Sequence, residues 1–200
     1  MSINLQKGQR IDLTKGNAGL NKIIVGLGWD PVQQKSGGLL GGLLGSKTPI
    51  DIDCDASVIM LQNDRLQDKT DVVYFGNLKG ANDSVTHSGD NRTGDGDGDD
   101  ETIYIELNAV PQNYNKLIFV VNIYDCVRRK QHFGMLQNAY IRIVNPATKE
   151  ELLKYNLSDN YSDQTTLITG EIYRHDNEWK FAAVGTGTQD ASISDICKRY

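Results

Sequence analysis

Three cysteines are all that the 200 residues contain, and Cys54, Cys126 and Cys197 are widely separated and show no CxxC spacing. An odd number of isolated cysteines excludes a disulfide framework and indicates no zinc site. We expect all three to be small, partly buried thiols in a reducing compartment.

Long hydrophobic runs are also missing. No segment approaches the roughly 18 apolar residues of a membrane-spanning helix. The first residues, MSINLQKGQRIDL, contain neither the apolar core nor the cleavage site of a signal peptide. The sequence therefore predicts a cytoplasmic location.

Basic residues are not in excess either, because the isoelectric point is about 5.2 and the formal net charge is −5. The only clustered positive charges are Arg128, Arg129 and Lys130. A protein that binds nucleic acid needs a basic face for the phosphates. We therefore exclude nucleic acid as a main partner.

The net charge comes from one segment, residues 90–101, which we call the acidic segment. It carries six carboxylates and one cation, Arg92, so that it alone accounts for the net charge of −5. Closely spaced carboxylates repel one another unless water or a hard cation compensates them, and the glycines between them let the backbone bend around an ion. Calcium is our first hypothesis, and a solvated acidic loop that binds nothing is the alternative.

A second acidic motif is DIDCDAS at residues 51–57. In a strand, alternate side chains share a face, so that Asp51, Asp53, Asp55 and Ser57 would oppose Ile52, Cys54 and Ala56. Since calcium takes six to eight oxygens, we expect this motif and the acidic segment to share one shell at the same end of the fold. Magnesium fits such a flexible site less well, and zinc prefers histidine and cysteine.

Two calcium motifs can be excluded. Asp95, Asp97, Asp99 and Glu106 have the spacing of positions 1, 3, 5 and 12 of an EF-hand loop, but Asp100 replaces the glycine required at position 6 and a strand pattern follows. A nonapeptide calcium roll requires repeats, and GDGDG occurs once.

Short segments rich in β-branched and aromatic residues, separated by Gly, Asn, Asp or Pro, run through the chain. The sequence predicts strands at 22–25, 51–61, 72–75, 102–107, 117–124, 139–144, 166–173 and 179–184. In TIYIEL, Ile103, Ile105 and Leu107 alternate with polar or amphipathic residues, as in a half-buried strand. We predict one all-β domain over residues 1–200, an antiparallel β-sandwich of about ten strands. A short C-terminal helix is predicted at 188–198, where Ile193, Ile196 and Cys197 have helical spacing.

A Gly/Leu-rich insertion, SGGLLGGLLGSK at residues 36–47, interrupts this pattern. Its five glycines disfavour a helix, so we predict a mobile loop. As an alternative, its leucines would form an apolar face for a membrane or a partner.

The ordered motifs resemble the TerD family of tellurite-resistance and stress proteins. They are GLGWD at 26–30, DIDCDASVIML at 51–61, VYFGNLK at 73–79, HSGDNRTGDGDGDDE at 87–101, FVVNIYD at 119–125 and FGMLQNAYIRIVN at 133–145. The resemblance spans nearly the whole chain. It implies a calcium-binding β-sandwich in the bacterial cytoplasm, linked to stress resistance and to TerC-type proteins at the inner membrane or to other stress proteins.

The resemblance also implies a ligand set for calcium, with two ions expected. The implied ligands are Asp53, Asp55, Ser57, Asp90, Asn91, Asp97, Asp99, Asp100 and Glu101, with Asp30 of the WD pair as a weaker candidate. The insertion after GLGWD departs from the pattern of many members but leaves these ligands intact.

No catalytic constellation stands out, and the family implies no enzymatic activity. Among the three histidines only His87 adjoins the acidic segment, and we expect it to be a surface residue. We therefore predict a non-enzymatic, calcium-ordered interaction module. Alternatives are a calcium-dependent module that contacts the membrane surface peripherally and, less favoured, a metal-dependent hydrolase.

Overall fold

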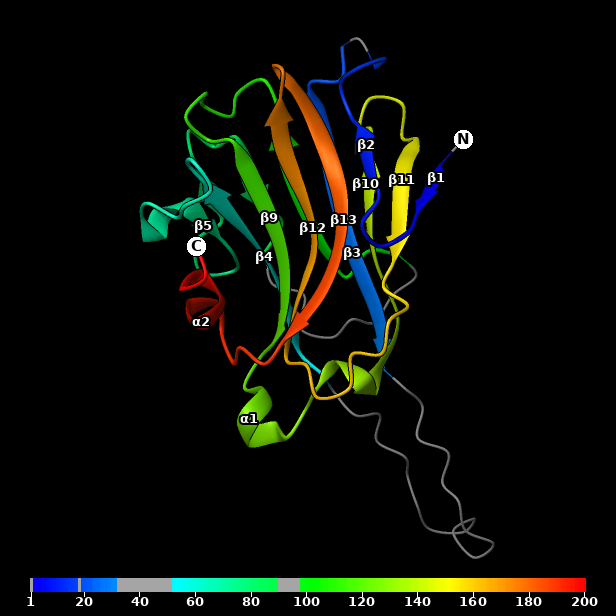
Figure 1. Cartoon of the computed structure of the whole chain (residues 1–200), viewed down its shortest axis with the longest axis vertical. Helices are drawn as coiled ribbons and strands as arrows, with labels where there is room; N and C mark the ends of the chain where they lie inside the picture. Colours follow the sequence, from blue (N-terminus) through cyan, green and yellow to red (C-terminus); the bar gives the residue numbers. More distant parts are fainter. Residues whose placement is uncertain (1, 18, 32–51, 90–97) are drawn as a thin grey trace, which may run out of the picture.

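Two β-sheets pack face to face in the computed structural model, which describes residues 2–17, 19–31, 52–89 and 98–200 (Figure 1). The seven-stranded sheet has the order β1 (Ile3–Leu5), β11 (Glu151–Asn156), β10 (Leu136–Val144), β3 (Lys22–Pro31), β8 (Glu101–Glu106), β7 (Val85–His87) and β6 (Lys79–Gly80). The six-stranded sheet has the order β2 (Arg10–Asp12), β13 (Glu178–Thr188), β12 (Thr166–His175), β9 (Lys116–Ile123), β4 (Cys54–Leu61) and β5 (Val72–Val73). The predicted β-sandwich is confirmed.

Helical structure among the described residues is short and lies outside the sheets. It consists of the 3-10 turns η1 (Lys69–Asp71) and η2 (Phe133–Met135) and the helices α1 (Cys126–Arg129) and α2 (Ile193–Cys197). None of these helices is long and apolar enough to cross a membrane. The paired strands are antiparallel except for β1, which lies parallel to β11.

Alternation of side chains builds the core between the sheets. In β8, Ile103 and Ile105 are fully buried, whereas Tyr104 between them is exposed. This is the half-buried strand that the alternation in TIYIEL predicts, because successive side chains of a strand point to opposite faces.

Strand β4 is buried on both faces, which its alternation alone does not reveal. Cys54, Ala56, Val58 and Met60 enter the main core between the sheets. The opposite side chains form a second apolar cluster on the outer face of the six-stranded sheet, made of Ile59, Leu61, Ile118, Val120 and Ile196 of α2. The C-terminal helix therefore covers part of this outer face, as its apolar spacing predicts.

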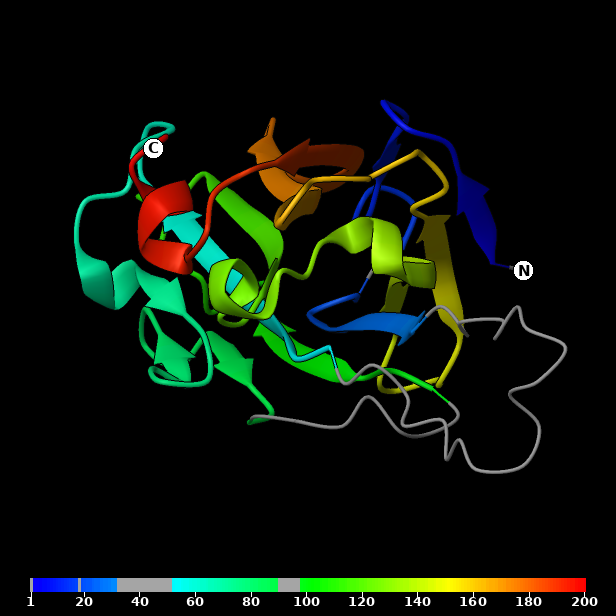
Figure 2. The same cartoon turned by 90° about the horizontal axis from the view of Figure 1, so that it is seen from below.

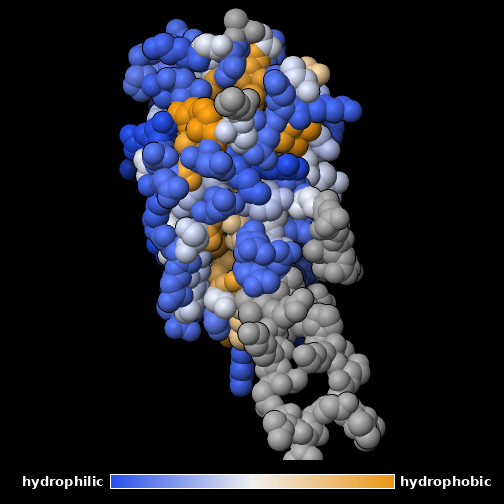
Figure 3. All heavy atoms as spheres, turned by 90° about the vertical axis from the view of Figure 1, so that its right-hand side faces the viewer, coloured by the Kyte–Doolittle hydropathy of each residue, from blue (hydrophilic) through white to orange (hydrophobic). Residues whose placement is uncertain are grey.

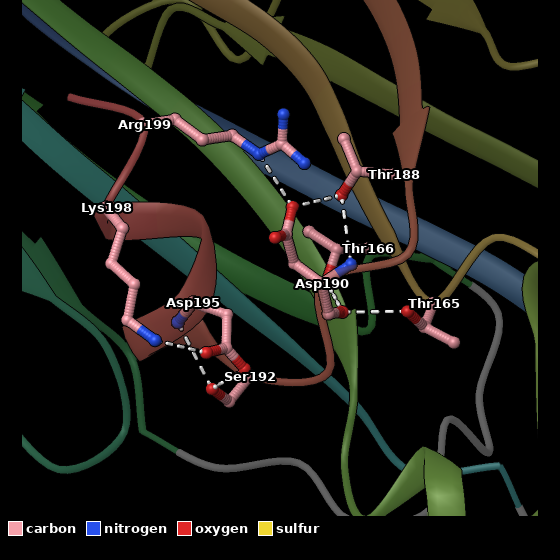
Figure 4. Close-up of polar contacts among 8 residues, drawn as sticks. All are labelled: Thr165, Thr166, Thr188, Asp190, Ser192, Asp195, Lys198 and Arg199. Carbon is pink, nitrogen blue, oxygen red and sulfur yellow. Dashed lines mark hydrogen bonds and ion pairs between the residues drawn. The ribbon is translucent and has the colours of Figure 1, made fainter.

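The C-terminal strap, residues 189–200, is fixed by a polar network around Asp190 (Figure 4). The side chains of Thr188 and Arg199 donate hydrogen bonds to Asp190 Oδ2 at 2.6 and 2.8 Å. Burial raises the pKa of Asp190, but these two hydrogen bonds together with the positive charge of Arg199 hold the pKa below its usual range. The backbone carbonyl of Asp190 accepts from the hydroxyls of Thr165 and Thr166 at 2.7 and 2.8 Å. The strap is thereby joined to the start of β12.

Several boundaries differ from the sequence-based expectations. The strand predicted at 22–25 continues to Pro31. The helix predicted at 188–198 is only Ile193–Cys197, because β13 extends to Thr188 and the helix starts after its N-cap, Ser192. Strands β1, β2, β6, β7 and β11 are not among the predicted ones. Four of these are only two or three residues long, too short to show a periodicity. The Gly/Leu-rich insertion at 36–47 lies outside the described residues.

Candidate functional site

The two acidic motifs meet at one end of the sandwich, onto which Figure 2 looks. Here β4 and β8 begin, and their neighbours β9 and β3 end. Cys54 is paired with Ile123 of β9, and Glu101 is paired with Leu27 of β3. The backbone therefore brings residues 53–57 and 98–101 to the same end, and α1 lies there as well.

Four carboxylates at this end lie near enough to Cys54 to act on its thiol. Burial holds the pKa of the Cys54 thiol well above its usual value, and the negative charges of four acids raise it further; in order of effect these are Asp55, Asp53, Asp100 and Glu101. The structure thus brings together two residues from each acidic motif. It also makes Cys54 a poor nucleophile, because the reactive form of cysteine is the thiolate.

Asp55 and Ser57 lie on the outer face of the six-stranded sheet, opposite to Cys54 and Ala56 in the core. The predicted alternation of these four residues is therefore confirmed. Directly across from Asp55 on β9 is Asn122, which is also buried. Ser57 Oγ and Asn122 Oδ1 have no hydrogen-bond partner among the described residues. Two buried oxygens without a partner, next to a buried carboxylate, are costly unless another group binds them.

Asn122 is a site residue that the sequence analysis missed. The signal for it was a single polar residue inside the apolar strand Lys116–Ile123. A polar side chain in a strand that is buried on both faces indicates a specific partner.

Asp100 faces the end of β3. Its Oδ2 accepts a hydrogen bond from the backbone N–H of Trp29 at 2.7 Å. Burial, and then the nearby charges of Asp30, Glu101 and Asp99, raise the pKa of Asp100 to about 6 despite this bond. A carboxyl group whose charged form is disfavoured in this way would be stabilised by a cation.

Glu101 points between the sheets and pairs with His87. His87 Nε2 lies 3.0 Å from Glu101 Oε2 and 3.1 Å from the carbonyl oxygen of Ala56. The other ring nitrogen, Nδ1, accepts a hydrogen bond from the N–H of Gly89 at 3.0 Å. The expectation of a surface histidine was wrong, because His87 is only 3% exposed. The imidazole joins both acidic motifs to the residue that immediately precedes the acidic segment.

Asp99 lies on the outer face of the seven-stranded sheet, where Arg142 holds it. Arg142 Nε and Nη2 donate to the two carboxylate oxygens of Asp99 at 2.7 and 3.0 Å, and the hydroxyl of Tyr140 donates to Oδ1 at 3.0 Å. Such a two-pronged guanidinium–carboxylate pair is strong and geometrically specific. Asp99 thus has its own cation, and a role as a calcium ligand stays a prediction.

The two glycines of GLGWD make this arrangement possible. A Cβ atom on Gly26 would lie 2.1 Å from Asp99 Oδ2, and one on Gly28 would lie 2.6 Å from the ring of Tyr140. Both glycines occupy the outer face of β3, while Leu27 between them and Trp29 after them are in the core. The two glycines of GLGWD therefore leave space on the outer face of β3 that the side chains of Asp99 and Tyr140 occupy.

Asp30 is exposed, and its Oδ2 accepts from the side-chain amide of Asn138 at 2.8 Å. Asp30 and Asp100 border a polar hollow of about 810 Å³ on the outer face of the seven-stranded sheet, together with Tyr140, Arg142 and Lys154. The side of the molecule with β1 and β11 is mostly hydrophilic (Figure 3).

The described ligand candidates do not form a complete metal shell from acidic, histidine and cysteine side chains. Within residues 2–17, 19–31, 52–89 and 98–200, no group of three or more such side chains is arranged to hold a metal ion. The predicted ligands Asp90, Asn91 and Asp97 lie outside the described residues. A shell at this end therefore requires neutral oxygens, such as those of Ser57 and Asn122, or residues of the acidic segment before Gly98.

Comparison with known proteins gives consistent matches over the full length. The TerD domain matches residues 1–200. The chain is 62% identical to stress response protein SCP2 of Bacillus subtilis (strain 168) over 200 residues, which cover both chains completely. It is 46% identical to general stress protein 16U of the same organism over 94% of this chain and 92% of the relative. It is 40% identical to tellurium resistance protein TerD of Serratia marcescens, over 100% and 97% of the two chains.

Two solved structures share the fold. A crystal structure of a protein of unknown function superposes with a TM-score of 0.66 at 22% identity, over 88% of this chain and 94% of the other. A homologue of telluride resistance protein TerD from Streptomyces coelicolor gives a TM-score of 0.63 at 21% identity, over 88% and 95%. At these identities the likeness concerns the fold alone.

Proposed function

Because this chain belongs to the TerD family of stress-response and tellurite-resistance proteins, we propose that it is a calcium-binding stress protein of the bacterial cytoplasm. In this proposal the ion is bound at the acidic end of the sandwich and makes that end a binding surface for another protein. The partner would be a TerC-type protein at the inner membrane or another stress protein. The chain would act by binding and would not be an enzyme.

The observation that carries the proposal is the pair of buried oxygens beside Asp55. Calcium prefers carboxylate, amide and hydroxyl oxygens, and these are the groups that Asp55, Asn122 and Ser57 present. No other described group bonds to Ser57 Oγ or Asn122 Oδ1, so that an ion bound there would satisfy both. These three residues would hold one calcium ion, with further ligands from Asp53, the acidic segment, backbone or water.

The acidic side chains at this end point in different directions, which supports two ions in place of one. Asp55 and Ser57 occupy the outer face of the six-stranded sheet, Glu101 points between the sheets, and Asp100 faces Trp29 at the end of β3. A second ion at Asp100 would draw its other ligands from the acidic segment. Bound calcium would supply the positive charge that offsets the repulsion among these carboxylates, and would thereby change the charge of the exposed end.

The cysteines give little support to direct thiol chemistry with tellurite. Cys54 and Cys126 are buried, and burial raises the pKa of the third thiol, Cys197, to about 11. A thiol with a raised pKa contains little of the nucleophilic thiolate at neutral pH. The alternative in which the insertion 36–47 touches a membrane stays a prediction, because this insertion lies outside the described residues.

Isothermal titration with calcium and with magnesium tests the proposal, and Ser57→Ala is the sharpest variant. Removing a buried hydroxyl that has no partner should leave the calcium-free protein as stable as before, or slightly more stable. The same change should weaken calcium binding if Ser57 Oγ is a ligand. Asp55→Ala should abolish binding at this position, whereas Glu150→Ala, which removes an exposed carboxylate outside both acidic motifs, should bind as the wild type does.

A wild-type protein that gives no heat with calcium would refute the proposal. Equal calcium affinity in the wild type, Ser57→Ala and Asp55→Ala would place the ion elsewhere and remove Ser57 and Asp55 from the shell.

A further inference from the structure

Residues 124–130, which we call the α1 knob, protrude from the acidic end of the sandwich (Figure 1). Val127 of α1 is 74% exposed, the highest value among the exposed large hydrophobic side chains in the described part of the chain. Tyr124 is 49% exposed. Scattered apolar residues on a surface need no explanation, but these two lie within four residues of each other on one projecting turn.

The fold presents Val127 outward by fixing both ends of the knob. Cys126 and Gln131 are buried, and the N–H of Gln131 donates to the carbonyl oxygen of Cys126 at 2.9 Å. Asp125 and Lys130 bracket the helix in the left-handed conformation, with φ of 52° and 54°. The tip is therefore a preformed turn with Cys126 in the core and Val127 directed to solvent.

The knob is also the positively charged part of an otherwise acidic end. Arg128 forms an ion pair with Asp125. Arg129 and Lys130 are exposed, and neither lies within ion-pair distance of a carboxylate in the described part of the chain. The guanidinium of Arg129 lies over the ring of Tyr124 at 5.5 Å. An aliphatic tip, an aromatic ring and two available cations are the side chains that enter the interface of an anionic bilayer.

We propose that the α1 knob is a docking surface for anionic phospholipid membranes. Val127 and Tyr124 enter the boundary between headgroups and acyl chains, while Arg129 and Lys130 contact lipid phosphates. A protein partner fits less well, because a typical protein interface occupies about 800 Å² and 20–30 residues on each side, and a convex turn of seven residues offers far less. A bilayer surface, in contrast, can surround a small convex tip.

The knob adjoins the candidate calcium site. The N–H of Tyr124 donates to the carbonyl oxygen of Asp53 at 2.8 Å, so that the knob begins beside the DIDCDAS motif. Carboxylates at the same end repel anionic lipid, and an ion that neutralises them strengthens docking. This calcium effect rests on the proposed function, whereas the contact made by the knob itself does not.

Co-sedimentation with vesicles tests the docking surface. The probes are vesicles of phosphatidylcholine alone and of phosphatidylcholine with phosphatidylserine, each with calcium and with a chelator. We expect wild-type protein to bind the anionic vesicles in both buffers, more strongly with calcium, and to leave the neutral ones. Each basic residue near an anionic surface contributes about fivefold to the partition, so Arg129→Glu combined with Lys130→Glu should lower it by at least about 25-fold. Val127→Asp should lower it about tenfold.

Matched controls separate the knob from general charge. Lys15→Glu combined with Lys149→Glu changes the net charge by the same amount. Both lysines are exposed, and they lie before the start of β3 and after the end of β10, away from the acidic end. Ile3→Asp places a carboxylate on another exposed hydrophobic residue. Both controls should bind vesicles nearly as the wild type does.

Several outcomes would overturn the docking surface. One is that the wild type does not bind anionic vesicles in either buffer. Another is that the lysine control pair loses as much binding as the knob variants. A third is that the knob variants bind as well as the wild type, which would favour an acidic protein segment as the partner of the knob. Binding that is the same with calcium and with chelator, but is lost in the knob variants, would support the knob while counting against the calcium effect.

Discussion

Calcium at roughly one hundred times its dissociation constant should raise the free energy of unfolding by about 2.7 kcal/mol relative to chelator. The reason is that the ligands are brought together only by folding. Asp55 and Ser57 belong to β4, and Asn122 is supplied by β9, more than sixty residues later in the chain. The unfolded chain has no such site, so that the binding free energy adds to the stability of the folded state.

Urea denaturation in calcium and in chelator measures this difference. Magnesium at the same concentration should stabilise much less, because it requires a tighter octahedral shell. Asp55→Ala should lose most of the calcium-dependent increment, whereas Glu150→Ala should keep it. Equal unfolding midpoints in calcium and in chelator would contradict the prediction.

The calcium-free protein should also show an inverse pH dependence from Asp100. Its pKa of about 6 lies above the value of about 3.9 for an unfolded chain. Between these two values the folded state binds more protons than the unfolded state, so this group makes stability fall as pH rises from about 4 to about 6. Asp100→Asn should remove this part of the slope, and an unchanged pH profile in that variant would contradict the assignment.

His87→Ala should destabilise the protein by about 3 kcal/mol or more, which is typical when one partner of a buried pair is removed. The imidazole connects three segments, since it contacts the carboxylate of Glu101, the carbonyl of Ala56 and the N–H of Gly89. Its loss leaves a cavity and withdraws a partner from the buried carboxylate of Glu101. It also removes the hydrogen bond that holds Gly89 ahead of the acidic segment, so we expect weaker calcium binding as well.

His175→Ala provides the control for this prediction. His175 is an exposed histidine at the end of β12, where it faces Asp176, and replacing it should change stability by no more than about 0.5 kcal/mol. Chemical denaturation of both variants gives the comparison, and hydrogen exchange at the Gly89 amide reports the local contact. A loss below about 1 kcal/mol for His87→Ala would show that the imidazole is not a structural link between the two motifs.

Local patterns made much of the fold predictable. The alternation in β8 and in the first half of β4 assigned their faces correctly, because a strand with one polar face has a period of two. The spacing of Ile193, Ile196 and Cys197 indicated the C-terminal helix, and all three residues pack in the second apolar cluster. These features depend only on residues that are close in sequence, so that the pattern can be read from the sequence itself.

Features that depend on distant partners were not predictable. Nothing near His87 in the sequence shows that Glu101 and Ala56 will enclose it. The strand predicted at 22–25 stops before Gly26 and Gly28, but both glycines belong to β3, where they admit Asp99 and Tyr140 from elsewhere in the chain. The capture of Asp99 by Arg142, 43 residues away, has the same origin. The sequence thus located the acidic end but could not divide its carboxylates among their partners.

The most direct test of the calcium site is a crystal structure grown with calcium, with the ion identified by its anomalous scattering. The central claim predicts a peak at about 2.3–2.6 Å from oxygens of Asp55, Ser57 and Asn122. A second peak at Asp100 would agree with two ions. Ordered crystals soaked in calcium with no peak beside these three residues, or with calcium bound only at another part of the surface, would contradict it.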